Sequence, residues 1–344
     1  MKTGSNFQYF KRLKITEKGK GQKPKEDSMK IVISPRELPK HVVKQIEQVH
    51  KDIKLIATED NNILEEYWPQ AEIIFSGKIN ADTLAKCKNL RWIQETSAGI
   101  ERYFYPEFLK RDIILTNVKG MHGQTISEHI FMMMLAHARN LKKYIHQQQT
   151  HLWQKHGIDE VDLLHHKVFL VIGLGGIGQK VAQIATAFGM RVEGIANTPK
   201  DLPFVEKTYT PDQLNQALPN ADYIVVAVPL TKKTKGMIGA QEFSLMKKDA
   251  FIVNIGRGLV IDEQAMIKAL QEGQIGGAGL DVFSNEPLAE DSPLWDMENV
   301  IITPHVAGHM PDYLGEAVKI FCSNLHCYLE GHKLENLVDK NMGY

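Results

Sequence analysis

Cysteine, long apolar runs and net charge are all scarce in this chain. Cys87, Cys322 and Cys327 are the three cysteines among 344 residues, and their spacing suits neither a disulfide framework nor a metal site. Ile224–Leu230 is typical of the longest apolar runs, so we expect no membrane span. Basic and acidic residues balance at 41 each, which gives no overall field for nucleic acid or an anionic membrane.

The balanced total hides a basic segment at the N-terminus. Residues 1–28 hold eight lysines and arginines against three acidic residues, with little apolar periodicity. This composition predicts disorder, with a basic arm that binds nucleic acid as the alternative. No apolar stretch follows the early charges, so a secretory signal is not expected. Together with the few cysteines, this predicts a reducing, cytoplasmic environment.

Two sets of alternating strand and helix patterns follow, and a length of 344 residues predicts two α/β domains. The first set predicts a flavodoxin-like parallel sheet. Its strands are Lys30–Ser34, Ile53–Ala57, Ile73–Phe75, Leu90–Gln94 and Ile113–Thr116. The second set predicts a Rossmann-type, doubly wound sheet. Its strands are Val168–Ile172, Arg191–Ile195, Tyr223–Val228, Phe251–Ile255, Gly277–Leu280 and Val300–Thr303.

Two long helices are predicted outside these alternating patterns. The first runs from Thr125 to about His151. Its run Ile130–Leu135 is apolar nearly all round, which indicates burial against the next domain or a second subunit. The second helix spans Tyr313–Glu330, and we expect it to return to the first domain. The first domain would then be discontinuous in sequence.

The most informative motif is Val168–Gly178, which reads V-F-L-V-I-G-L-G-G-I-G. An apolar strand runs into Gly173-x-Gly175-x-x-Gly178, and a helix is predicted from Gln179. A buried strand that ends in glycines and turns into a helix directs backbone N–H groups and a positive helix end at a pyrophosphate. The motif predicts a dinucleotide site, with a tight turn that binds nothing as the alternative.

Three polar residues follow separate strands of the second predicted sheet. They are Arg257, Glu286 and His305. Ligands bind beyond the carboxyl ends of parallel strands, so we expect these residues to gather there. Arg257 offers a fork of donors for a carboxylate and a keto oxygen. His305 as imidazolium can donate a proton, while Glu286 would orient the ring and favour its charged form. Taken singly, a surface ion pair, a helix-entry charge and a buried histidine are the alternatives.

Around these residues the sequence resembles the D-isomer-specific 2-hydroxyacid dehydrogenases. The motifs are N-I-G-R-G-L-V-I-D-E, G-L-D-V-F-S-N-E-P-L, P-L-W-D-M-E-N-V-I-I-T-P-H-V-A-G, T-S-A-G-I at Thr96–Ile100 and V-P-L-T-K-K-T at Val228–Thr234. The resemblance runs from about Met29 to the C-terminus. It implies a cofactor domain at 119–307, a substrate domain at 29–118 plus 308–344, and a homodimer formed through the cofactor domain.

The resemblance also implies which residues contact the ligands. The cofactor residues are Gly173, Gly175, Gly176, Ile177, Gly178, Asn197, Thr198, Pro229, Thr234, Ile255 and Asp281, the last at the nicotinamide carboxamide. The substrate residues are Gly77, Ala98, Gly99 and Arg257. Ala98 and Gly99 would present backbone N–H groups to the substrate carboxylate. No metal is implied.

The end of the second Rossmann strand favours NADP over NAD. An NAD site places Asp or Glu there to bind the ribose hydroxyls, but here Ala196 takes that position. Asn197, Thr198 and Lys200 follow, and they can donate to a 2′-phosphate. Glu193 lies three residues earlier, within the strand. The usual arginine is missing from this turn, so we expect a modest preference, with NAD also used.

These observations predict an oxidoreductase that reduces a small 2-keto acid, such as glyoxylate or hydroxypyruvate, to a D-2-hydroxy acid. A phosphoglycerate dehydrogenase is the alternative within the family. The chain ends 39 residues after His305, which leaves no room for the regulatory domain that many of those enzymes add. A nucleotide-sensing binding protein on the same fold is the third interpretation. No nucleic acid or membrane partner is expected.

Overall fold

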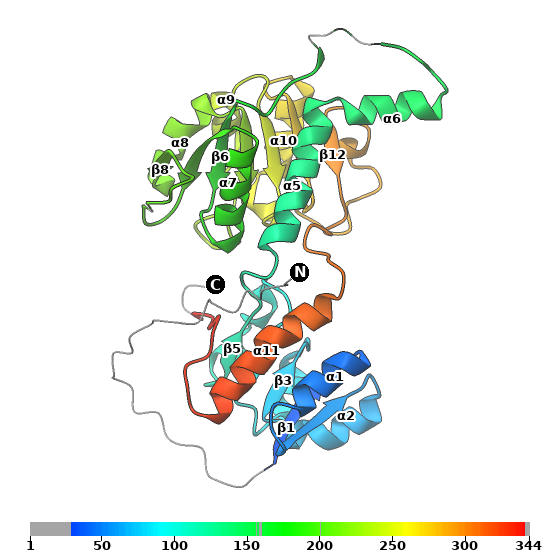
Figure 1. Ribbon diagram of the computed structural model, residues 1–344, viewed down its shortest axis with the longest axis vertical. Coiled ribbons are helices and arrows are strands. Elements are labelled where there is room, and N and C mark those ends of the chain that lie inside the picture. Colours follow the sequence, from blue (N-terminus) through cyan, green and yellow to red (C-terminus); the bar gives the residue numbers. More distant parts are fainter. Residues whose placement is uncertain (1–28, 156, 158–159, 200, 341–344) are drawn as a thin grey trace, which may run out of the picture.

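The computed structural model describes residues 29–155, 157, 160–199 and 201–340. Two separate sheets form the framework, and Figure 1 shows them in two halves of the molecule. The predicted disorder of residues 1–28 falls outside the described residues. Within the described ranges, no helix combines the length and apolar character needed to cross a membrane.

The first sheet has five parallel strands in the order β2-β1-β3-β4-β5, which is the order of flavodoxin-like folds. The strands are β1 (Lys30–Ser34), β2 (Ile53–Ala57), β3 (Ile73–Phe75), β4 (Trp92–Gln94) and β5 (Ile114–Thr116). The predicted fold class is confirmed for this half. The last two strands start slightly later than the sequence predicted, because residues before them lie in tight turns.

Helices cover both faces of the first sheet. One face carries α2 (Asn61–Tyr67), α3 (Ala81–Lys86) and α4 (Pro106–Leu109). The other carries α1 (Lys40–Glu47) and α11 (Tyr313–Leu329). Phe321 of α11 stacks on Phe75 with 4.5 Å between ring centroids. The C-terminal helix therefore completes the core of the first sheet, as Figure 1 shows. Domain borders at 118/119 and 307/308 stay a prediction.

The second sheet has seven parallel strands in the order β12-β11-β10-β9-β6-β7-β8, a Rossmann order with one strand added. The strands are β6 (Val168–Ile172), β7 (Arg191–Ile195), β8 (Lys207–Tyr209), β9 (Tyr223–Val226), β10 (Phe251–Asn254), β11 (Gly277–Leu280) and β12 (Val300–Ile302). The fold class is again confirmed. Strand β8 at the sheet edge was not predicted, because its three residues carry no apolar run.

The helices of the second half also form two layers. One layer contains α5 (Gly123–Ala138) and α7 (Gly176–Ala187), and the other contains α8 (Leu214–Ala217), α9 (Ala240–Leu245) and α10 (Glu263–Gln271). The predicted single helix from Thr125 to His151 is wrong. It is broken into α5 and α6 (Leu141–Gln149) by Asn140, which has a φ of +52°. Asparagine tolerates this left-handed conformation, and its side chain donates to the Glu160 carbonyl oxygen.

Candidate active site

The glycine loop after β6 is crowded at two glycines and open at the third. Gly173 has a φ of +108°, and a Cβ there would lie 2.8 Å from the Ala227 carbonyl oxygen. A Cβ on Gly178 would collide with the Gly173 carbonyl oxygen. At Gly175, the described chain places nothing within 4 Å of an added Cβ beyond its immediate neighbours. Open space beside a helix N-terminus fits a pyrophosphate.

The other residues assigned to the cofactor lie at the start of α7 and on the loops after β9 and β10. Gly176 and Ile177 form the start of α7, where the first N–H groups have no acceptor within the helix. Ile255 follows β10. Pro229 and Thr234 belong to the loop after β9, where the Thr234 hydroxyl donates to the Pro229 carbonyl oxygen at 2.6 Å. These loops share the carboxyl edge of one sheet, and their contacts with a cofactor stay a prediction.

The turn after β7 presents neutral polar side chains to solvent. Asn197 and Thr198 are exposed, and Ala196 is half-buried. Glu193 is buried and accepts a hydrogen bond from the Tyr209 hydroxyl at 3.1 Å. Its carboxylate therefore points toward β8 rather than into the turn. Lys200, the third residue considered for a 2′-phosphate, lies outside the described residues.

His305 and Glu286 form a hydrogen-bonded pair on the loops after β12 and β11. His305 Nδ1 lies 2.7 Å from Glu286 Oε2, and Glu286 Oε1 accepts from the Phe283 N–H at 3.1 Å. One carboxylate oxygen of Glu286 thus anchors the acid to its own loop, and the other orients the imidazole ring of His305. Because Nδ1 faces Glu286, Nε2 is the nitrogen that can face a substrate. A Cβ on Gly258 would collide with Phe283, so the loop of Arg257 touches the loop of Glu286.

Buried Asp281 holds the loop that carries His305. Its carboxylate accepts hydrogen bonds from the Thr303 hydroxyl at 2.6 Å and from the N–H groups of Val306 and Ala307 at 2.9 and 3.0 Å. Its carbonyl oxygen accepts from the His305 N–H at 2.9 Å. His305 has a φ of +56°, an unfavourable conformation that these bonds stabilise. The predicted contact of Asp281 with the nicotinamide carboxamide stays a prediction.

His129 of α5 extends this network and was not found from the sequence. Its Nε2 lies 2.9 Å from Thr303 Oγ1 and 3.7 Å from Asp281 Oδ1. Burial lowers the pKa of His129, and the nearby Asp281 only partly opposes the shift. No motif marks this histidine, since it lies in an apolar helix. In the described ranges, no three His, Cys, Asp or Glu side chains are grouped to hold a metal ion.

The substrate loop after β4 offers backbone donors. The N–H groups of Thr96 and Ser97 are used, because both donate to Glu95 Oε1 at 2.9 and 3.0 Å. The N–H groups of Ala98 and Gly99 have no acceptor in the part of the chain that the structure describes. Such donors suit an anion.

Gly77, assigned to the same pocket, lies on the loop after β3. A Cβ there would lie 2.6 Å from Pro35 Cγ, so this position has no room for a side chain. Its carbonyl oxygen accepts a hydrogen bond from the Tyr103 hydroxyl at 2.6 Å. The structure therefore gives Gly77 a packing role, and its contact with substrate stays a prediction.

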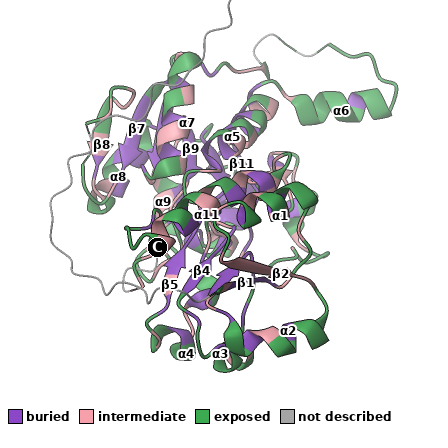
Figure 2. Ribbon diagram, turned by 60° about the horizontal axis from the view of Figure 1, so that its bottom comes forward, coloured by how far each residue is buried: buried purple, intermediate pink, exposed green. Residues whose placement is uncertain are grey.

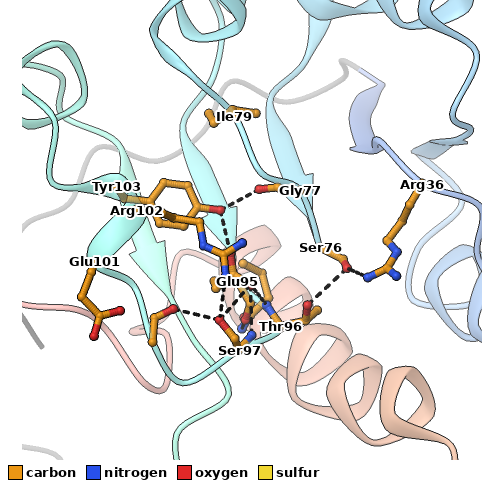
Figure 3. A network of polar contacts seen from close by, with 12 residues as sticks. Arg36, Ser76, Gly77, Ile79, Glu95, Thr96, Ser97, Glu101, Arg102 and Tyr103 are labelled. Carbon is orange, nitrogen blue, oxygen red and sulfur yellow. Dashed lines mark hydrogen bonds and ion pairs between the residues drawn. The ribbon is translucent and has the colours of Figure 1, made fainter. Parts of the chain in front are cut away.

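A buried acid supports the substrate loop, as Figure 3 shows. Glu95 is 4% exposed, and its Oε2 lies 2.8 Å from the Tyr103 hydroxyl. Burial, reinforced by Glu95, raises the pKa of Tyr103, which keeps the phenol a neutral donor. Beside it, the Ser76 hydroxyl contacts Arg36 Nη1 at 3.1 Å and Thr96 Oγ1 at 3.2 Å. Sequence reasoning missed this network, because its members lie on three separate loops.

Arg257 reaches across from the second sheet to the substrate loop. Its Nε and Nη2 lie 3.0 and 3.2 Å from the two carboxylate oxygens of Glu101, in the 3-10 helix η2 (Glu101–Tyr103). Its Nη1 donates to the Gly256 carbonyl oxygen at 2.7 Å. A Cβ on Gly99 would collide with Arg257 Nη2. Arg257 and the predicted substrate loop are therefore in contact. Glu101 was not identified from the sequence.

His122 lies where the chain passes between the two halves. It is buried, and its Nε2 lies 2.9 Å from the Tyr313 hydroxyl, which donates to the Thr96 carbonyl oxygen at 2.7 Å. Because the hydroxyl donates to Thr96, His122 Nε2 carries the hydrogen. Its Nδ1 has no partner among the described residues. Burial lowers the pKa of His122.

Comparison with known proteins shows which family this chain belongs to. Residues 131–307 match the family model of the D-isomer specific 2-hydroxyacid dehydrogenase, NAD binding domain. A glyoxylate reductase of Pyrococcus furiosus is 30% identical over 338 residues, which cover 95% of this chain and 94% of that protein. A D-3-phosphoglycerate dehydrogenase of Methanocaldococcus jannaschii is 35% identical over 269 residues. That match covers 78% of this chain but spans only 51% of the relative.

The fold has a close counterpart among solved structures. The NADPH-dependent glyoxylate/hydroxypyruvate reductase of Sinorhizobium meliloti, solved in complex with NADP and sulfate, superposes with a TM-score of 0.81 at 26% identity. The match covers 92% of this chain and all of that one. Both halves of the molecule are therefore shared with that structure.

Proposed function

Because this chain belongs to the D-isomer specific 2-hydroxyacid dehydrogenase family, whose members are NAD(P)-dependent oxidoreductases, we propose that it reduces glyoxylate, hydroxypyruvate or a similar small 2-keto acid to a D-2-hydroxy acid. The observation that carries the proposal is the contact of 2.7 Å between His305 Nδ1 and Glu286 Oε2. It leaves Nε2 for the substrate oxygen, on the sheet edge that also holds the open glycine loop.

Arg257 and the substrate loop would bind the carboxylate of the keto acid. Arg257 brings a permanent positive charge to the loop, where its Nη2 lies against Gly99. The N–H groups of Ala98 and Gly99 add neutral donors at the same place. Charge-assisted hydrogen bonds of this kind hold both the position and the plane of a carboxylate.

His305 would donate the proton in the reduction. When bound, NADPH would supply a hydride to the keto carbon, and the electron pair of the C=O π bond would move to the oxygen. That oxygen takes the proton from His305 Nε2, which leaves a neutral imidazole. Glu286 keeps the ring oriented and balances its charge before the transfer. The His305 side chain is 49% exposed, so water can return the proton afterwards.

We also propose that the enzyme prefers NADP to NAD. Support comes from the turn after β7, where Asn197 and Thr198 are exposed and Glu193 is turned toward Tyr209. A 2′-phosphate there would meet the side-chain donors of Asn197 and Thr198. The related reductase of Sinorhizobium meliloti is NADPH-dependent.

Replacing Ala196 by Asp tests this preference. The new carboxylate would accept hydrogen bonds from the ribose hydroxyls and repel a 2′-phosphate. We expect the ratio of kcat/KM for NADPH to that for NADH to fall about tenfold, or about 1.4 kcal/mol. The matched control is Ala196→Ser, which adds a side-chain oxygen without charge. An unchanged ratio in the Asp variant would contradict the placement of the ribose.

A homodimer formed through the cofactor half is proposed as the assembly. Helix α6 projects from that half in Figure 1, and Figure 2 shows it almost entirely exposed. Large apolar side chains lie exposed on α5, on α6 and just beyond: Met132, Leu135, Leu141, Ile145 and Trp153, the last 94% exposed. A second copy would cover these side chains. Light scattering checks the mass.

The three cysteines are free, and we propose a cytoplasmic location, where thiols stay reduced.

A panel of 2-keto acids, each with NADPH and with NADH, tests the main proposal. Glyoxylate and hydroxypyruvate should be reduced, with a D configuration for the product of hydroxypyruvate by chiral chromatography. Phosphohydroxypyruvate covers the phosphoglycerate dehydrogenase alternative, which is less favoured because a relative named glyoxylate reductase matches over 94% of its length. Nucleotide binding without turnover of any keto acid would contradict the proposal and favour a sensor.

A further inference from the structure

We propose that Glu101 is a positioning residue for Arg257. In this assignment, Glu101 binds the Nε edge of the guanidinium and leaves the terminal edge for the substrate carboxylate. The inference rests on the proposed function, because it takes a 2-keto acid as the ligand of Arg257. It concerns a residue that no motif in the sequence singles out.

The hydrogen bonds of Arg257 divide its guanidinium into two edges. A guanidinium has five N–H bonds in a fixed plane. Nε and one N–H of Nη2 point at the two oxygens of Glu101, at 3.0 and 3.2 Å. One N–H of Nη1 points at the Gly256 carbonyl oxygen, at 2.7 Å. Two N–H bonds remain, one on each Nη, and a carboxylate can bind the terminal edge of a guanidinium with two parallel hydrogen bonds.

The guanidinium of Arg257 touches the substrate loop through its Nη2. Nη2 belongs to both edges of the guanidinium, and it is the atom that a Cβ on Gly99 would collide with. The N–H groups of Ala98 and Gly99 have no acceptor among the described residues. An anion at the terminal edge would therefore have backbone donors beside it. Glu101 follows this loop directly, so one short segment supplies both the donors and the acid that orients Arg257.

The Glu101–Arg257 pair is too exposed to serve mainly as a stabilising contact. The two side chains are 40% and 31% exposed, and half-exposed ion pairs contribute little to stability. The pair fixes the direction of the Arg257 guanidinium, because a long arginine side chain otherwise samples many rotamers. Glu101 comes from the first half of the molecule and Arg257 from the second. The pair thus sets the guanidinium relative to the substrate loop before substrate arrives.

The first test compares Glu101→Gln with the matched control Glu107→Gln, an exposed acid on α4. Glu101→Gln should lower kcat for the keto acid about tenfold, because a small misplacement of a bound substrate slows chemistry strongly. Glu101→Asp keeps the negative charge on a shorter side chain, so its kcat should lie between those of the parent and of Glu101→Gln. Glu107→Gln should match the parent, and the melting temperatures of both Gln variants should stay within about 2 °C of it. A Glu101→Gln variant with more than half of the parental kcat overturns the proposal.

A double-mutant cycle shows whether Glu101 acts through Arg257. Lysine cannot bind a carboxylate with two parallel hydrogen bonds, so Arg257→Lys removes the contact in question. In that background, Glu101→Gln should change kcat by no more than about twofold, against about tenfold in the parent. Equal losses in both backgrounds would mean that the two residues act independently, and the assignment would be wrong.

Chemical modification gives a readout that needs no turnover. Phenylglyoxal condenses with free guanidinium groups, and mass spectrometry of the peptide with Arg257 measures the rate. Modification should be several-fold faster in Glu101→Gln than in the parent or in Glu107→Gln. Oxamate, an unreactive 2-keto acid analogue, should protect Arg257 in the parent with NADPH present. Equal rates in all three proteins, or no protection, overturn the inference. If the parent reduces no keto acid, the proposed function fails, while these rates still decide the inference.

Discussion

The two sheets share one architecture, yet their ligand edges are built differently. Where the glycine loop follows β6, the edge of the second sheet offers backbone and empty space, with Gly175 open and Gly173 and Gly178 packed closely behind it. The edge of the first sheet offers side chains that bond to one another around Glu95 and Ser76. A pyrophosphate needs N–H groups and room, whereas a small keto acid needs charge and orientation. Under the proposed function, the pyrophosphate pocket would depend on open backbone, and the keto-acid pocket on side chains that hold one another in place.

The largest expected effect tests whether the chemistry belongs to one edge. His305→Ala removes the proposed proton donor and should lower kcat by about 10³-fold, or about 4 kcal/mol. The Kd for NADPH should stay within about twofold, because the glycine loop is untouched. His309→Ala, at an exposed neighbouring histidine, is the control. Activity surviving in the His305 variant would place the proton donor elsewhere.

The next effect tests the edge of the first sheet, where side chains around Glu95 bond to one another. Glu95→Ala leaves the N–H groups of Thr96 and Ser97 without their acceptor, and the Tyr103 hydroxyl keeps only the Gly77 carbonyl oxygen. We expect a loss of about 2–3 kcal/mol in the free energy of unfolding, measured with urea. Glu107→Ala, an exposed acid, should cost less than about 0.5 kcal/mol. Similar losses for both variants would show that the buried network adds no stability.

A pair of glycine variants sharpens the comparison from the other edge. Gly175→Ala places a methyl group in open space, so the protein should fold normally but bind NADPH about tenfold more weakly, or about 1.4 kcal/mol. Gly178→Ala would collide with the Gly173 carbonyl oxygen, so its melting temperature should fall as well. Calorimetry and nucleotide titration separate the two outcomes. Equal melting temperatures would mean that the loop packs less tightly than described.

The smallest effect is a pH dependence that arises at the junction and in the second half. Burial lowers the pKa of His122, at the junction, and of His129 and His137, on α5. The unfolded chain then binds protons more readily, so stability is complete above a pH of about 6.5 and declines as the pH falls below it. We expect a decline of about 1 kcal/mol between pH 7 and pH 5. His122→Gln should reduce the slope, and an unchanged slope would remove His122 from this group.

The fold could be predicted where strands are buried on both faces. The runs Phe251–Val253 and Ile224–Val226 are apolar throughout, which is how parallel strands appear in sequence. Strand β8 was missed because an edge strand of three residues needs no such run. The break at Asn140 was missed because neither glycine nor proline marks it, and the left-handed turn depends on a bond to Glu160.

The site could be predicted only as far as its residues lie in motifs. Glu286 and His305 follow adjacent strands, and the structure places them in contact. Arg257 was expected at the substrate, and it does lie against Gly99. Its partner Glu101 is far away in sequence, so no local pattern reveals the pair. Glu95 was missed for another reason: a single acid before a loop gives no sign of burial.

Helix α11 has a consequence for how the chain is made. Phe321 lies against Phe75 and Trp92, with ring centroids 4.5 and 5.2 Å away, so the first sheet lacks part of its core until this helix exists. Synthesis of the roughly 200 residues between Val118 and Tyr313 takes about 10–40 s at ordinary translation rates. During that time α1 alone covers one face of the first sheet, while the second half emerges and can fold. The half that begins the chain is thus the last to be finished.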